Sequence, residues 1–471
     1  MGDEMKRLFK KTWYGIVWGT FYALIAIPLA VLMSVLAKTH PFLTLLFVGT
    51  FSLLNYFISR RKVTAFFASN TLFLPFVYPL MFADYVGEIG SNMWQILIGE
   101  LIVVSWISGI IYILLAIVAR FISLKNYRRV FPPYIIGALL VLLGLSLFIR
   151  LGYDQALVPL VQQGNIVPLF SVLVGSLVAV FVRLLTKPTN FFHRTFILVG
   201  LLFAVGSTFA FEAIAVALGQ IYFLDTSVYY PLSNLTFNLD LIPLFEQPDY
   251  YFNYLDNLYF STDLILFILP VTMISFSKLF EDIVHQKHAD GEKHHLENDI
   301  DEILLSNGLS LMISNLGGAS FVTSVNHHEI KSKKGSRFIA LFILFVFTVL
   351  FGLSSFANQI IEAIPLAVYS GIAMAVALLF IVYGIKIFLR SRKENPGKKN
   401  TVIFIATLLA GLPCLGFDMY EYVTTERLLS LQIGTVHLNY LFIALMVGIL
   451  FNMVLIRKKK VVPLSHRPQA K

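Results

Sequence analysis

"SNGLSLMISNLGGASFVTSVNHHEI", residues 306–330, is the stretch that decides the fold. It begins as an apolar segment rich in small residues, of the kind that crosses a bilayer, and passes through Gly317 and Gly318. Six polar residues then follow in quick succession: Thr323, Ser324, Asn326, His327, His328 and Glu329. Because hydrocarbon offers polar groups no partner, the segment is either a surface loop or the lining of a site that the rest of the protein encloses.

The composition indicates which solvent surrounds the chain. Of its 471 residues, 57% are hydrophobic and 13% are charged, and the mean hydropathy is +0.78; soluble domains carry about 25% charged residues. Apolar runs of about 17–25 residues match the hydrocarbon core, and about fourteen of them lie between Tyr14 and Ile456. The first run is too long for a secretory signal, so we expect it to be retained. The chain is therefore predicted to be an all-α polytopic membrane protein.

Lysine and arginine residues cluster in alternate connections and in both terminal segments. The positive-inside rule places this basic face, with both termini, in the cytoplasm. We expect the membrane to be the plasma membrane. The longest connection on the other face, residues 222–260, contains five acidic residues and no lysine or arginine. The net charge of +9 is thus expected to anchor the topology in the lipid bilayer, and nucleic acid is not an expected partner.

The acidic connection separates two halves of similar length. A seven-plus-seven inverted repeat is the architecture that this division predicts. We divide the chain into a first repeat, an extracytoplasmic loop, a second repeat and a basic cytoplasmic tail: residues 1–219, 220–261, 262–456 and 457–471.

Two short, interrupted spans occupy the third place in each half, at residues 62–75 and 317–330. Matching broken spans indicate a substrate site near the bilayer midplane, between the third and tenth spans. Unwound backbone there is expected to leave amide groups free, and the N-termini of half-helices present partial positive charge to a ligand.

Four segments carry a resemblance to the nucleobase/ascorbate transporter family, which includes uracil and xanthine permeases. NGLSLMIS and GGASFVTSVN, residues 307–314 and 317–326, resemble its ninth and tenth spans; FPPYIIGALLVLLGLSL, residues 131–147, resembles its fifth; and FASNTLFL, residues 67–74, its third. The resemblance implies a uracil permease-like fold and a secondary active transporter working by elevator-type alternating access. A nucleobase-like small molecule is the implied substrate, with a proton or sodium as coupling ion and a possible homodimer.

The chain departs from that family at two positions. Where the family has a glutamate in the eighth span, this sequence offers Ser275, Ser277 and Lys278, and in the tenth span His327 replaces the second glutamate. ISFSKLF, residues 274–280, resembles the sulfate permease family instead, as do IAIPLAV and IPLAV at residues 25–31 and 364–368. The alternative function is therefore a sulfate permease-type transporter of inorganic or organic anions that lacks the cytoplasmic regulatory domain.

The polar residues of the third, eighth and tenth spans form the predicted substrate site: Ser69, Asn70, Ser275, Lys278, Thr323, Ser324, Asn326 and His327. Two groups are candidates for ion coupling, because an imidazole titrates near neutrality and an acid inside a span is costly: His327 and Glu212. Lys278 separates the two substrate classes. A small anion would need its charge, whereas a neutral nucleobase would not.

Other chemistry is not expected. The four histidines after the eighth span, His285, His288, His294 and His295, are interpreted as a solvated linker, so no metal site and no cofactor are predicted. No nucleophile, base and orienting acid occur together, which argues against an enzyme. The single cysteine, Cys414, rules out an intramolecular disulfide.

Overall fold

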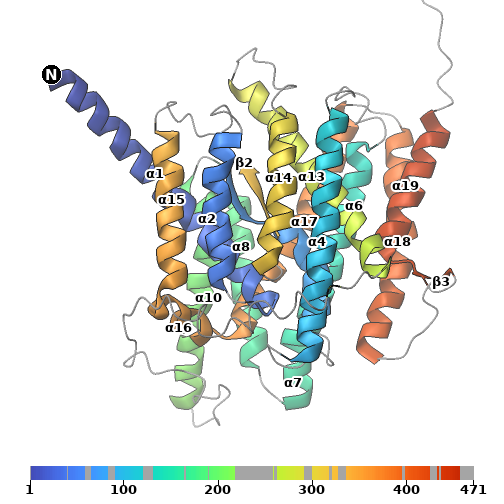
Figure 1. The fold of residues 1–471 in the computed structure, drawn as a ribbon. Coiled ribbons are helices and arrows are strands. Elements are labelled where there is room, and N and C mark those ends of the chain that lie inside the picture. The colour runs from blue at the N-terminus through green and yellow to red at the C-terminus, as the bar shows by residue number, and fades with distance from the viewer. Residues whose placement is uncertain are drawn as a thin grey trace, which may run out of the picture.

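A computed structural model describes residues 2–39, 41–58, 65–82, 91–119, 131–163, 166–188, 190–217, 258, 262–290, 300–317, 321–326, 336–394, 398–424, 432–433 and 436–456. Most of this chain is helical (Figure 1). The elements of the first half are α1 (Gly2–Leu36), α2 (Pro41–Ile58), β1 (Ala65–Ser69), η1 (Thr71–Phe73), α3 (Leu74–Met81), α4 (Asn92–Ala119), α6 (Pro133–Gly152), η2 (Tyr153–Leu157), α7 (Val158–Gln163), α8 (Val167–Leu185), α9 (Phe191–Arg194) and α10 (Phe196–Ala217). Those of the second half are α13 (Thr262–Asp290), α14 (Ile300–Ser314), η6 (Asn315–Gly317), β2 (Val322–Asn326), α15 (Arg337–Leu353), α16 (Ser355–Ala363), α17 (Leu366–Glu394), α18 (Lys398–Thr424), β3 (Gln432–Ile433), β4 (Val436–His437) and α19 (Tyr440–Ile456).

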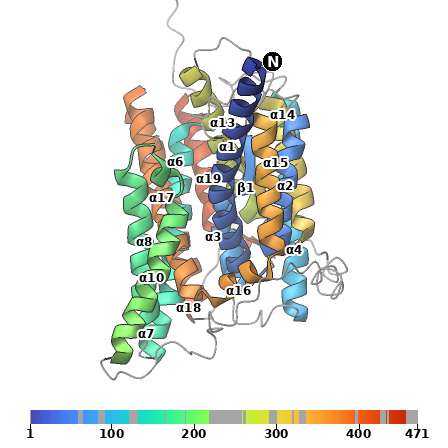
Figure 2. The same cartoon turned by 90° about the vertical axis from the view of Figure 1, so that its left-hand side faces the viewer.

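The helices form two bundles, each built from both halves of the chain. In the first, α15 packs on α1 and α2, and α4 packs on α13 and α14 around the paired strands β1 and β2. We call this the strand bundle. In the second, α17 packs on α6 and α8, α10 packs on α8, and α18 packs on α6 and α19. We call this the α17 bundle; Figure 2 shows α8 and α10 well separated from α2, α14 and α15.

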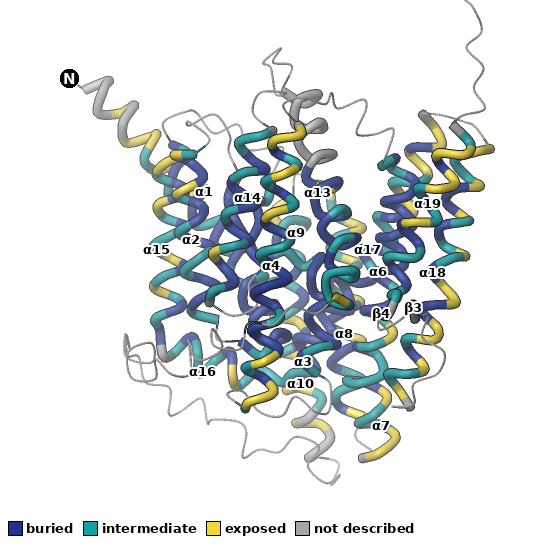
Figure 3. The backbone as a smooth tube through the Cα atoms, turned by 45° about the vertical axis from the view of Figure 1, so that its right-hand side comes forward, coloured by how far each residue is buried: buried dark blue, intermediate teal, exposed yellow. Residues whose placement is uncertain are grey.

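Among the described residues, eight helices are long and apolar enough to cross a membrane, and four shorter helices are apolar as well. The exposed side chains of the outer helices are themselves apolar, such as Phe203 on α10, Leu409 on α18 and Val454 on α19. Figure 3 shows exposed positions along α18 and α19, with buried backbone in the middle of the molecule. Apolar exposed surface of this kind suits lipid. The count of fourteen spans and the inverted repeat stay predictions.

The two predicted interruptions meet as an antiparallel pair of strands. Ala65 pairs with Asn326, Phe67 with Ser324, and Ser69 with Val322. We call β1 and β2 together the ribbon. Segments about 250 residues apart in the sequence are thus side by side in the middle of the strand bundle.

A ribbon of two strands has two unpaired edges, and a buried edge must find hydrogen bonds elsewhere. Helix side chains supply them. On one edge, the Phe67 amide donates to Ser52 Oγ of α2 at 2.8 Å. On the other, the Ser324 amide donates to Asn307 Oδ1 at 2.6 Å, and Ser310 Oγ of α14 donates to the Val322 carbonyl at 2.6 Å. These side chains let strand backbone exist inside a helical membrane protein.

Aromatic stacking fixes the ribbon from both ends. Tyr22 of α1 stacks on Phe66 with ring centroids 4.7 Å apart, and Phe73 of η1 stacks on Phe321 at 4.3 Å. Phe66, Phe73 and Phe321 are almost completely buried. The ribbon is therefore held by aromatic packing near both of its ends as well as by hydrogen bonds.

Glycine pairs allow the closest helix crossings, one in each bundle. A Cβ on Gly308 of α14 would lie 2.7 Å from the carbonyl oxygen of Gly109 in α4, and a Cβ on Gly109 would lie 2.7 Å from the carbonyl oxygen of Gly308. In the α17 bundle, a Cβ on Gly137 of α6 would lie 2.6 Å from the carbonyl oxygen of Gly384 in α17. Small residues at such crossings let the two backbones touch. Each bundle is therefore tightly packed within itself.

We predict that Gly308→Ala lowers the stability of the detergent-solubilised protein by about 1–3 kcal/mol, because the added methyl group must push two helix backbones apart. Thermal unfolding measures the loss. The matched control is Gly206→Ala on α10, where an added Cβ meets nothing within 4 Å. Equal unfolding temperatures for the two variants would contradict the close crossing of α4 and α14.

Candidate functional site

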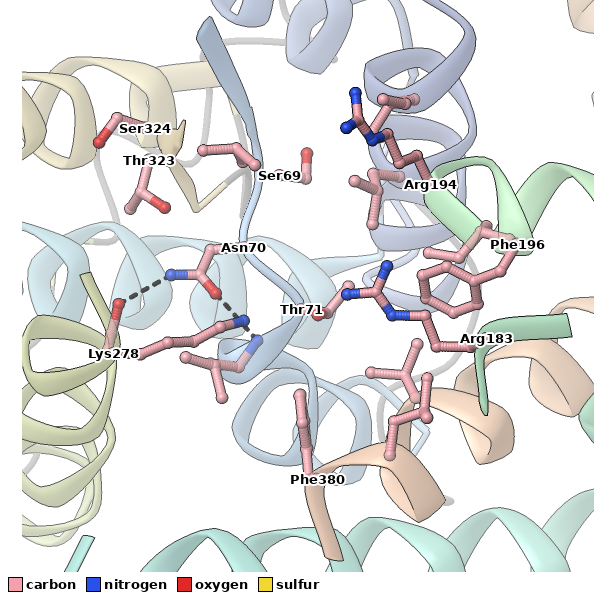
Figure 4. Close-up of a pocket in the computed structure, with 18 of the residues that line it drawn as sticks. Ser69, Asn70, Thr71, Arg183, Arg194, Phe196, Lys278, Thr323, Ser324 and Phe380 are labelled. Atoms are coloured by element: carbon pink, nitrogen blue, oxygen red, sulfur yellow. Dashed lines mark hydrogen bonds between the residues drawn. The ribbon is translucent and has the colours of Figure 1, made fainter. Parts of the chain in front are cut away.

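A cavity of about 190 Å³ lies between the two bundles. The strand bundle contributes side chains from α1, α4, α13, η1 and the ribbon; the α17 bundle contributes side chains from α8, α10 and α17, with Arg194 from the short helix α9. Figure 4 shows Ser69, Thr323 and Ser324 of the ribbon on one side, with Arg183, Arg194 and Phe196 on the other. The cavity is thus formed where the two bundles face each other.

Asn70 organises the polar wall. Its Oδ1 accepts a hydrogen bond from the Leu72 amide at 3.1 Å and so caps η1, while its Nδ2 donates to Ser275 Oγ of α13 at 2.8 Å. Ser275 Oγ in turn shares a hydrogen bond of 2.7 Å with the hydroxyl of Tyr112 on α4. Through Ser275, this one side chain connects the end of the ribbon to α13 and α4. Asparagine is a favoured residue at the N-cap position of a helix.

The expectation of free backbone amides at the broken spans is wrong for the described amides of Phe67, Asn70, Leu72 and Ser324. The Asn70 amide donates to the Phe321 carbonyl at 2.8 Å, and the other three donate to the side chains described above. The reason is that the segments form strands and a capped turn rather than unwound helix ends. These four amides are therefore not available to a ligand.

Ser69 Oγ is a buried hydroxyl at the cavity wall with no hydrogen-bond partner in the described protein. Leaving a buried hydroxyl unpaired costs about 1–3 kcal/mol. A ligand that donates or accepts at this position would remove that cost. Thr323, which is also buried, lines the cavity from the neighbouring strand.

Arg183 is the best-held cation at the cavity. Its Nε donates to the Tyr383 hydroxyl at 2.7 Å, its Nη1 donates to the His193 carbonyl at 2.8 Å, and its guanidinium lies 5.2 Å from the centroid of the Phe196 ring. Burial and the neighbouring Arg183 hold the pKa of His193 below its usual range. Arg183 therefore brings a permanent positive charge to this side of the cavity.

Lys278 and Arg194 also line the cavity. Lys278 is an exposed side chain of α13, and in Figure 4 it reaches toward Asn70 from the side opposite to Arg183. Arg194 is committed elsewhere: its Nε donates to the Pro188 carbonyl at 3.1 Å, and its guanidinium lies 5.7 Å from the Phe21 ring centroid.

The remaining wall is apolar and comes from both bundles. It includes Leu29, Leu279, Val376, Leu379 and Phe380. Small-molecule sites usually have a mostly apolar wall that carries a few polar groups.

The structure brings six of the eight predicted substrate residues to this one cavity: Ser69, Asn70, Ser275, Lys278, Thr323 and Ser324. The backbone of Asn326 belongs to β2, but its side chain lies outside the described residues, as do His327 and the side chain of Glu212. His294 and His295 also lie outside them, as do the side chains of His285 and His288. No group of three potential metal ligands occurs in the part of the chain that the structure describes.

Sequence reasoning missed Arg183, Tyr112 and Tyr383. Arg183 belongs to a basic run that the positive-inside rule already explained, and the two tyrosines lie in apolar helices where they are indistinguishable from core residues. Only the tertiary contacts bring them to the site.

Solved transporter structures share this fold. The transmembrane domain of the cyanobacterial bicarbonate transporter BicA matches with a TM-score of 0.50 and 17% identity, over 94% of this chain and 98% of that one. The murine anion transporter Slc26a9, in its inward-facing state, matches with a TM-score of 0.52 and 13% identity, over 94% of this chain and 68% of that one. Identities this low establish the fold alone.

Sequence relatives cover most of the chain. A pyrimidine permease by description, RutG of Escherichia coli (strain K12), is 25% identical over 399 residues, which is 84% of this chain and 82% of that protein. The uracil permease of Paenibacillus larvae subsp. larvae is 20% identical over 428 residues, 90% of each. Residues 17–415 match the model of a permease family, which is named after xanthine and uracil permeases. The chain therefore belongs to this permease family and is an integral, multi-pass membrane transporter.

Proposed function

We propose that the protein is a secondary active transporter that carries a nucleobase-like solute, bound in the cavity between the strand bundle and the α17 bundle. The position of this cavity supports the proposal. It lies between two separately packed bundles, and its polar wall is built from the end of the ribbon. Sites of secondary transporters form at such interfaces from discontinuous spans.

The size and chemistry of the cavity suit one planar heterocycle. An apolar cavity of about 150 Å³ accommodates benzene, so a cavity of about 190 Å³ has room for a six-membered ring with substituents. The Ser69, Asn70 and Thr323 side chains can hydrogen-bond ring edges, while Leu379 and Phe380 offer an apolar surface to a ring face.

The curated relatives support a nucleobase over an inorganic anion. They are named as pyrimidine and uracil permeases, and they align over more than four-fifths of this chain. The anion transporters are similar in fold at identities of 17% or less, which carries no information about substrate.

For the transport cycle, we propose alternating access of the elevator type. The strand bundle, with α1–α4 and α13–α15, would move as a unit against the α17 bundle and carry the cavity wall with it. Tight glycine crossings within each bundle support motion of whole bundles rather than of single helices. We further propose proton or sodium coupling through His327 or Glu212, plasma-membrane localisation with cytoplasmic termini, and a homodimer.

Asn70→Ala is expected to weaken solute binding about tenfold or more, because it removes a ligand-facing amide together with the cap of η1 and the bond to Ser275. Binding of labelled uracil by the purified protein measures this. The matched control is Asn452→Ala, which removes a hydrogen bond from the Tyr134 hydroxyl far from the cavity. If Asn452→Ala reduced binding as strongly as Asn70→Ala, the cavity would not be the site.

His327→Gln is expected to leave solute binding measurable and to abolish the pH dependence of uptake, because an imidazole with a pKa of about 6.5 exchanges protons across ordinary gradients. Uptake into proteoliposomes at several external pH values tests this, with Glu212→Gln as the companion variant. A pH profile unchanged in His327→Gln but lost in Glu212→Gln would assign coupling to the glutamate; a profile unchanged in both would reject the two candidates.

A further inference from the structure

We infer that the solute is bound as an anion: a planar oxo-heterocycle with one negative charge, held between Lys278 of the strand bundle and Arg183 of the α17 bundle. This inference rests on the proposed function and specifies its substrate class. Arg183 is not among the substrate residues predicted from the sequence. With Lys278 on α13 and Arg183 on α8, each bundle contributes a cation to the same cavity (Figure 4).

The charge of the described cavity wall is one-sided. Its lining includes Lys278, Arg183 and Arg194, and no aspartate or glutamate is among the described residues that line it. Two cations that face each other repel, and because Lys278 is exposed, solvent screens part of this repulsion. An anion between them removes the repulsion, whereas a neutral base leaves it in place.

Both cations have donors to spare. A guanidinium has five N–H donors, and the hydrogen bonds of Arg183 to described residues use Nε and one proton of Nη1. Lys278 makes no hydrogen bond or ion pair with any described residue. Because Tyr383, His193 and Phe196 already fix the guanidinium, it can bind an oxyanion or a ring N–C=O edge with little loss of side-chain entropy.

The neutral groups of the cavity favour a ring over a small inorganic ion. A water molecule occupies about 30 Å³ of liquid, so a compact inorganic ion would fill only part of the 190 Å³. The apolar wall formed by Val376, Leu379 and Phe380 would then have no ligand packed against it. A heterocycle with a carboxylate or an ionised ring nitrogen satisfies the charge and covers the apolar wall together.

The test compares uracil with orotate, which is the same ring carrying a carboxylate, and hypoxanthine with urate, at pH 7. Binding to the purified protein is measured by competition with a labelled ligand and by thermal stabilisation. We expect orotate and urate to bind at least about tenfold more tightly than their neutral counterparts, because charge-assisted hydrogen bonds are about twice as strong as neutral ones.

Lys278→Met and Arg183→Gln should each weaken binding of the anions about tenfold or more and change binding of the neutral bases by less than about twofold. The matched control is Lys386→Met, an exposed lysine of α17 whose Nζ lies 5.8 Å from the Tyr383 ring centroid and which is not part of the cavity lining. It should bind all four compounds as the unchanged protein does. Arg183→Lys, which keeps the charge, should weaken anion binding less than Arg183→Gln does, and Lys278→Met alone makes the test if Arg183→Gln does not fold.

The outcomes distinguish a failure of the anion inference from a failure of the proposed function. Tighter binding of uracil or hypoxanthine than of the anions would overturn the inference and leave the nucleobase proposal standing. Binding of bicarbonate or sulfate, with no binding of any of the four heterocycles, would overturn both. Anion binding that is insensitive to both Lys278→Met and Arg183→Gln would also overturn the inference, because the charge would then be recognised elsewhere.

Discussion

The hydrogen bonds at the two edges of the ribbon are the constraint on which the rest of the structure depends. Strand backbone inside a membrane protein needs a partner for every N–H and C=O, and two short strands can satisfy only the edges that face each other. Ser52 of α2 and Asn307 and Ser310 of α14 supply partners for three backbone groups on these outer edges, the Phe67 and Ser324 amides and the Val322 carbonyl. Without them, residues 65–69 and 322–326 would have to be helical or exposed to water.

The ribbon makes a rigid wall for the cavity because its neighbours are fixed in turn. Asn307 also donates to the Ile303 carbonyl and to Ser324 Oγ, so one side chain binds both its own helix and the strand. At the end of β1, Asn70 repeats the arrangement with η1 and Ser275. Polar side chains that are fully hydrogen-bonded in this way order a site. Residues that line the cavity and have hydrogen-bonding capacity left for a ligand include Ser69, Lys278 and Arg183.

Much of this arrangement could be predicted from the sequence. The composition requires a membrane protein, and the polar residues at 323–324 and 69–70 are too many to face lipid. That these segments pair as strands could not be predicted, because a short apolar run has no periodicity that distinguishes strand from helix and its partner lies about 250 residues away. Arg183 was equally hidden, since a basic residue near the end of a span is normally explained by topology. Asn307 was recognised as part of a motif, but its role follows only from the position of Ser324.

We propose that the solute binds at the ribbon wall, between the two bundles. The chain has one cysteine, the buried Cys414, so Cys414→Ser with Thr323→Cys gives a single thiol at that wall. The rate of its reaction with a small water-soluble thiol reagent, in proteoliposomes with and without solute, tests the claim most directly. We predict that saturating uracil or orotate slows the labelling of Thr323→Cys at least about fivefold by occupying the cavity. An unchanged labelling rate in protein that still takes up the solute would contradict the account.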